Sequence, residues 1–175
     1  MIDHKNVIFY DTEFSDLNIR TGELLSIGLV SYSGDELYIE LPYNNPVHPW
    51  VEEHVLPYLN GKQVDKQTAR TEVTSFVQKH SRGAEKPYLV AYVNQFDSMY
   101  WYDLFESPTD HPVFWIPIDF ASILFAHGFE PNSMGKESFF ELLNIEKAKF
   151  TAHNALEDAR LLRETYVQFF EYIQR

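Results

Sequence analysis

The sequence contains no cysteine, which excludes a disulfide framework, a thiolate metal site and a cysteine nucleophile. It also contains no apolar run as long as a membrane span, and its first residues, Met1 to Lys5, lack the apolar core of a signal peptide. These absences are typical of a cytoplasmic protein with no membrane partner, and we expect that location here.

Basic residues are few, because 14 Lys and Arg stand against 26 Asp and Glu, which gives a formal net charge of −12. Such a balance argues against a protein that grips long nucleic acid through a broad basic surface. It is compatible with a small acidic metal site that acts on one end of a strand. The length of 175 residues and the 45% hydrophobic content predict a single domain over residues 1–175.

Apolar patterning predicts an α/β fold. Strands are expected at 7–10, 24–32, 36–41, 88–93 and 113–118. Helices are expected at 51–59, 68–80, from near Asp97, at 120–127, at 136–143 and from 155 to the C-terminus. The turn Ser33-Gly34-Asp35 favours an antiparallel meander, and the later alternation of strands and helices favours parallel additions. The result is a mixed five-stranded sheet flanked by helices.

Two carboxylates follow the first apolar strand. Asp11 and Glu13 are two residues apart, so in a strand their side chains point to the same face, roughly 6.5 Å apart along the chain. Carboxylates in such a place must reach water or find cations, because burial of an unpaired carboxylate is costly. For the pair taken alone, an exposed strand end is the simpler explanation, and a metal site is the alternative.

The C-terminal helix carries a third carboxylate. Asn154 can cap this helix, and Glu157 stands three residues later, as in a capping box. At about 100° per residue, Asp158 shares a face with the apolar residues Leu162 and Phe169, so it points toward the protein body. The positive end of the helix dipole satisfies part of its charge. A metal ion is the other way to satisfy it.

Two further residues complete a possible ligand set. His153 precedes the cap and can reach the same place from the connecting loop, whereas Asp97 follows the strand at 88–93 and suits a plain N-cap equally well. Asp119 is expected to be an N-cap. Four carboxylates and one imidazole fit two hard divalent cations, Mg²⁺ or Mn²⁺, with the imidazole as general base in phosphodiester hydrolysis.

Three motifs resemble those of the DEDDh superfamily of 3′→5′ exonucleases. They are Asp11-Thr12-Glu13, Asn94-Gln95-Phe96-Asp97 and His153-Asn154-Ala155-Leu156-Glu157-Asp158. The resemblance implies a ribonuclease-H-like fold. It also implies that two metal ions are held by Asp11, Glu13, Asp97 and Asp158, and that His153 is the general base.

Within that superfamily the chain looks most like the small exoribonucleases of the RNase AS type, on Asp11-Thr12-Glu13-Phe14 and on Leu25-Ser26-Ile27-Gly28-Leu29-Val30. The resemblance implies hydrolysis of single-stranded RNA or 3′ overhangs to nucleoside 5′-monophosphates, and a homodimer. Phe14 is a candidate contact for the terminal nucleotide, although strand parity also suits it to the core. The alternatives are an exonuclease acting on DNA and a non-catalytic RNA- or nucleotide-binding module.

Overall fold

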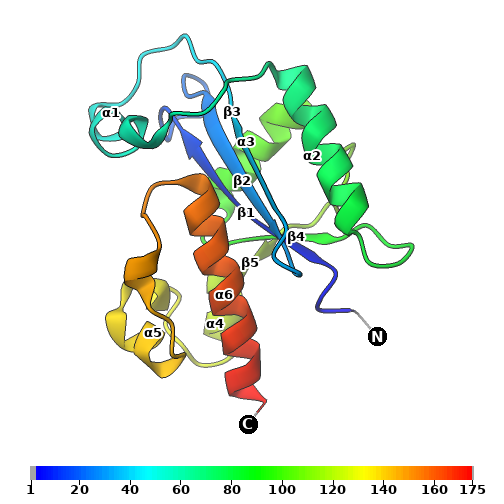
Figure 1. Cartoon of the computed structure of the whole chain (residues 1–175), viewed down its shortest axis with the longest axis vertical. Helices are drawn as coiled ribbons and strands as arrows, with labels where there is room; N and C mark the ends of the chain where they lie inside the picture. Colours follow the sequence, from blue (N-terminus) through cyan, green and yellow to red (C-terminus); the bar gives the residue numbers. More distant parts are fainter. Residues whose placement is uncertain (1–2, 175) are drawn as a thin grey trace.

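The computed structural model describes residues 3–174 and contains one five-stranded sheet in the order β3-β2-β1-β4-β5 (Figure 1). β1 pairs with β2, and β2 with β3, in antiparallel fashion, whereas β4 and β5 are added in parallel. The predicted mixed sheet is therefore confirmed. The strands are β1 (Val7–Phe14), β2 (Leu24–Ser31), β3 (Glu36–Glu40), β4 (Tyr88–Ala91) and β5 (Ile118–Asp119).

Helices cover both faces of the sheet (Figure 1). One face packs against α2 (Lys66–His80) and α3 (Gln95–Phe105), and the other against α4 (Phe120–Ala126), α5 (Glu137–Leu142) and α6 (Ala155–Ile173). The short helix α1 (Pro49–His54) lies beside the end of β1. Three 3₁₀ turns complete the elements: Leu56–Tyr58, Ser133–Gly135 and Lys147–Lys149. Within residues 3–174 no helix is long and apolar enough to cross a bilayer.

The pleat of β1 decides which residues face which layer. Ile8 and Tyr10 belong to the core on the α2 and α3 face, whereas Val7 and Phe9 belong to the core on the α6 face. Because side chains alternate along a strand, Asp11 and Glu13 continue the row of Val7 and Phe9, and so point toward α6. The same alternation sends Thr12 toward α3.

The expected strand at 113–118 is wrong over most of its length, because β5 holds only Ile118 and Asp119. Pro117 has no N–H to donate, so the ladder does not extend backward through it. The expected helix at 51–59 is split into α1 and a 3₁₀ turn. Asp97 is not an N-cap, since α3 begins at Gln95 after Asn94. Asp119 caps α4 as expected.

A glycine allows α6 to approach the sheet closely. Gly28 of β2 is paired with Asp11 of β1. A Cβ atom at Gly28 would lie 2.3 Å from the carbonyl oxygen of Ala155, the first residue of α6. The helix therefore begins directly over the strands, and this contact brings Asp158 beside Asp11. Bidentate pairing of Arg160 with Glu36 ties the same helix to β3.

We expect Gly28→Ala to lower the free energy of unfolding by about 1–3 kcal/mol or more, because backbone atoms of α6 must move to admit the methyl group. The comparison variant is Gly135→Ala, where an added Cβ has no neighbour within 4 Å. That variant is expected to stay within about 0.5 kcal/mol of the original chain. Chemical denaturation of both variants tests the contact, and equal stabilities would contradict it.

Candidate active site

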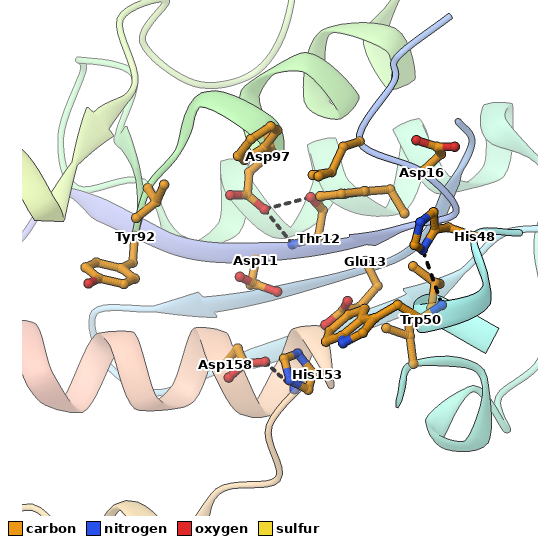
Figure 2. A pocket seen from close by; sticks show the side chains of 16 residues that line it. Asp11, Thr12, Glu13, Asp16, His48, Trp50, Tyr92, Asp97, His153 and Asp158 are labelled. Atoms are coloured by element: carbon orange, nitrogen blue, oxygen red, sulfur yellow. Dashed lines mark hydrogen bonds between the residues drawn. The ribbon is translucent and has the colours of Figure 1, made fainter. Parts of the chain in front are cut away.

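Three carboxylates meet where the end of β1 passes the start of α6. Asp11 and Glu13 from β1 and Asp158 from α6 each offer an oxygen atom, and these atoms lie within 4.8 Å of one another. Figure 2 shows the three side chains pointing into the same space between the strand and the helix. Strand alternation and the helical face thus place these residues together as the sequence predicted.

Asp97 lies on the other side of β1, and it is not part of the three-carboxylate group. Its Oδ1 atom accepts hydrogen bonds from the N–H of Thr12 at 3.0 Å and from the hydroxyl of Thr12 at 2.7 Å (Figure 2). The pleat of β1 explains the separation, because Thr12 faces α3 while its two neighbours face α6. Asp97 is buried, and its Oδ2 atom remains for another ligand.

His153 is joined to the carboxylate group through its backbone. Its N–H donates to Oδ2 of Asp158 at 2.9 Å (Figure 2). The residue has a positive φ of 61°, which an L-residue adopts at a cost in free energy. Asn154 caps α6 by accepting from the N–H of Glu157, so His153 does precede the helix as predicted. Glu157 contacts Arg160 instead of completing a capping box.

Burial and mutual repulsion raise the pKa of every carboxyl group in the site. Desolvation is the largest cause throughout, and the neighbouring negative charges add to it. The pKa of Asp11 lies well above its usual range, and the pKa of Glu13 is raised to about 8. The pKa values of Asp97 and Asp158 are each raised to about 6. Hydrogen bonds from Thr12 and from His153 oppose the rise in those two groups.

The donor set fits a hard divalent cation. Among the ion pairs of residues 3–174, none joins a Lys or Arg side chain to Asp11, Glu13, Asp97 or Asp158. The group therefore has no ion-paired counter-charge among these residues, although the charge of Lys147 lowers the pKa of Asp158 from a distance. Carboxylate oxygens are the ligands that Mg²⁺ and Mn²⁺ prefer. Asp11, Glu13 and Asp158 are the residues able to hold such an ion together.

The carboxylates lie in a cavity of about 620 Å³ whose mouth carries apolar side chains. Leu17 and Trp50 line it and are 62% and 44% exposed. Phe14 also lines it, while its ring stacks on Tyr100 at 4.5 Å between centroids. The core packing that strand parity predicted for Phe14 is thus confirmed, and its contact with a nucleotide stays a prediction.

Leu17, His48 and Trp50 also line the cavity, and sequence reasoning did not single them out as site residues. The one available signal in the sequence for Leu17 was an apolar residue within a polar segment that follows the strand. Nothing local indicates His48 or Trp50, because their segment reaches the cavity only through the fold. Trp101, by contrast, packs in the core, at 1% exposure.

A second backbone turn with positive φ borders the cavity. Val93, which lines it, has a φ of 60°, an unusual conformation for a β-branched residue. Its N–H donates to Oδ1 of Asp119 at 2.9 Å, and the same carboxylate caps α4. Asp119 therefore joins the end of β4 to the start of α4 and holds the turn that leads into α3.

No protein-family model matches the chain, and no curated protein has significant sequence similarity to it. Solved structures do resemble it. A zinc-bound complex of E. coli exonuclease I with single-stranded DNA aligns with a TM-score of 0.64 and 14% identity, over 96% of this chain and 40% of the other. Another exonuclease I structure aligns with a TM-score of 0.62 and 14% identity, over 92% of this chain and 39% of the other. E. coli exonuclease I with a dT13 oligonucleotide aligns with a TM-score of 0.60 and 15% identity, over 95% of this chain and 43% of the other.

The chain has the ribonuclease-H-like exonuclease fold. At 14% and 15% identity the likeness concerns the fold, and the chain spans about two fifths of the length of exonuclease I. The fold implied by the DEDDh motifs is therefore confirmed. Membership of the RNase AS-type subgroup stays a prediction.

The raised pKa values predict a pH-dependent stability of the metal-free protein. A raised pKa means that the folded state holds a proton which the unfolded state releases at lower pH. In EDTA, the free energy of unfolding is therefore expected to fall as the pH rises from about 4, where unfolded carboxyl groups ionise, through 6 and then 8. Denaturation at several pH values measures this slope.

Asp11→Asn removes one of the interacting charges and should flatten the slope. Mn²⁺ should raise the stability of the original chain most at the upper end of the pH range, where the carboxylates are ionised. A stability in EDTA that stays constant from pH 5 to 8 would rule out the electrostatic description of the site.

Proposed function

We propose that the protein is a metal-dependent 3′→5′ exonuclease that acts on single-stranded nucleic acid and prefers RNA. The observation that carries this proposal is the meeting of Asp11, Glu13 and Asp158 within 4.8 Å, in a cavity that His153 also lines. The likeness of the fold to exonuclease I supports it. A binding module without activity would not need a complete set of acidic residues beside an imidazole.

In this proposal, some residues of the chain bind cations and one transfers a proton. Asp11, Glu13 and Asp158 hold the divalent cations, and Asp97 supplies its free oxygen from the other side of β1. When bound, two such ions neutralise the charge that develops on the phosphate and on the departing 3′-oxygen. His153 accepts a proton from the attacking water as the new P–O bond forms and the P–O3′ bond breaks. The product is a nucleoside 5′-monophosphate.

The shape and charge of the site favour the end of a single strand. The cavity mouth offers apolar surface at Leu17 and Phe14, against which a terminal base can pack without sequence readout. The net charge of −12 provides little general attraction for a long duplex. The cations would therefore supply most of the attraction for the scissile phosphate.

RNA and DNA are supported by different observations. The preference for RNA rests on the resemblance of the motifs at Asp11–Phe14 and Leu25–Val30 to RNase AS-type enzymes. DNA, the second candidate, is favoured by the exonuclease I complexes, which contain single-stranded DNA. A cytoplasmic location and a homodimer are part of the proposal and stay predictions.

A time course on 5′-labelled RNA and DNA oligonucleotides of identical sequence tests the proposal. With Mg²⁺ or Mn²⁺ we expect a ladder that shortens from the 3′ end, faster on RNA, and no cleavage in EDTA. Asp11→Asn and Asp158→Asn should each lose nearly all turnover, because each removes a negative ligand. No cleavage of either strand by a metal-loaded protein would refute the proposed activity.

The matched control is Asp103→Asn, because Asp103 is an exposed residue of α3 that pairs with Lys66 and does not line the cavity. This variant should cleave at the rate of the original chain. If the same ladder appears on DNA alone, the proposed exonuclease activity stands, but the substrate is DNA and not RNA.

His153→Ala should slow hydrolysis by on the order of 10²–10⁴-fold, the usual contribution of a general base. Affinity for the oligonucleotide should change little, since the cation ligands remain. Partial desolvation of the ring and, after it, the nearby His54 lower the pKa of His153, so the rate of the original chain should rise with pH through a value below 6.5 as the imidazole loses its proton. If the variant keeps that dependence, His153 is not the base.

A further inference from the structure

The imidazole of His153 has no polar group to orient it. Its backbone N–H is bonded to Asp158, but in the part of the chain that the structure describes neither ring nitrogen has a hydrogen-bond partner. A histidine that serves as a base is usually oriented by a hydrogen bond to its second nitrogen. His153 is an exposed residue of a loop, so its ring needs another source of order.

Aromatic rings of α1 surround it instead. The ring of Trp50 lies 4.8 Å from that of His153 between centroids, at an interplanar angle of 85°. The ring of His54 stacks on that of Trp50, with 4.6 Å between centroids and an interplanar angle of 9°. His54 and His153 are 6.5 Å apart and also perpendicular. Edge-to-face and offset stacked arrangements of this kind are the favourable ones for aromatic pairs.

The stack is itself fixed to the protein core. Val51 and Val55 of the same segment are buried against Leu25 of β2. Trp50 and His54 stand four residues apart, so they share another face of the helix. Nδ1 of His54 lies 2.8 Å from the carbonyl oxygen of Trp50, within hydrogen-bond distance, which holds the second ring over the first.

We propose that Trp50 and His54 are positioning residues that hold the imidazole of His153 in place for proton transfer. The inference rests on the proposed nuclease function and names a role for a helix that carries no metal ligand. Packing against Trp50 limits the rotation of the His153 side chain, and His54 limits that of Trp50. Loss of this support leaves the metal ligands intact while the base becomes misplaced.

A simple contact between Trp50 and a nucleotide base predicts something different. Trp50 lines the cavity, so its removal could weaken substrate binding, whereas His54 does not line the cavity. A positioning role lowers kcat in variants of either residue, but a base contact raises KM in variants of Trp50 alone.

The experiment measures kcat and KM on a short RNA oligonucleotide for Trp50→Ala, Trp50→Phe, His54→Ala and His54→Phe. We expect Trp50→Ala to lower kcat by about 10- to 100-fold, the scale expected for a misplaced reacting group, with KM within about twofold. His54→Ala should lower kcat less. Both phenylalanine variants keep an aromatic ring and should recover most of the loss. Trp115→Ala, which removes a 55% exposed tryptophan outside the cavity, is the matched control.

A second readout does not depend on activity. The ring-proton resonances of His153, assigned by comparison with His153→Gln, should move in Trp50→Ala because the neighbouring indole ring current is lost. They should stay in place in Trp115→Ala. Unmoved resonances, or a Trp50→Ala variant with full kcat in a protein that cleaves RNA, would overturn the positioning role alone. A wild-type protein that cleaves no strand would remove the proposed function and the positioning role with it.

Discussion

Three carboxylates held within 4.8 Å of one another, with no ion-pair partner among residues 3–174, are the constraint on which the site depends. Their repulsion and burial raise their pKa values, so the ionised, metal-free site opposes folding. The surrounding structure overcomes that repulsion. β1 is a central strand with partners on both sides, and α6 is fixed by its close contact at Gly28 and by the Arg160–Glu36 pair. A cation bound by the three oxygens would relieve the repulsion and stabilise the fold.

The pleat of β1 divides the acidic residues into two sets. Asp11 and Glu13 face α6, whereas Thr12 faces α3 and holds Asp97. The last residues of β1 thereby place two of the four carboxylates directly and hold Asp97 through Thr12, while α6 supplies Asp158. The arrangement requires helices on both faces of the sheet, which is why the site belongs to the fold and not to a local motif.

The sequence predicted the parts of this arrangement that depend on local periodicity. Alternation placed Asp11 and Glu13 together, and helical spacing turned Asp158 inward. Tertiary context decided what local patterns could not predict. Asp97 looked like a cap, but its role depends on a bond to Thr12, 85 residues away. Trp50 meets His153 only because α1 and the loop before α6 converge in space. The strand expected at 113–118 was shortened by Pro117, whose effect depends on which neighbour it would pair with.

Asp158 occupies a special place among the four carboxylates because it belongs to two interactions. It is one of the three clustered ligands, and its Oδ2 atom also accepts the N–H of His153, whose φ is 61°. A residue in that conformation costs about 1–3 kcal/mol and persists only when its surroundings hold it. Across the cavity, Asp119 likewise accepts a hydrogen bond from the N–H of Val93, which also has a positive φ. The carboxylate that would hold the cation therefore also fixes the loop that carries His153. Replacement of Asp158 would disturb both, whereas replacement of Asp11 would leave the hydrogen bond to the loop in place.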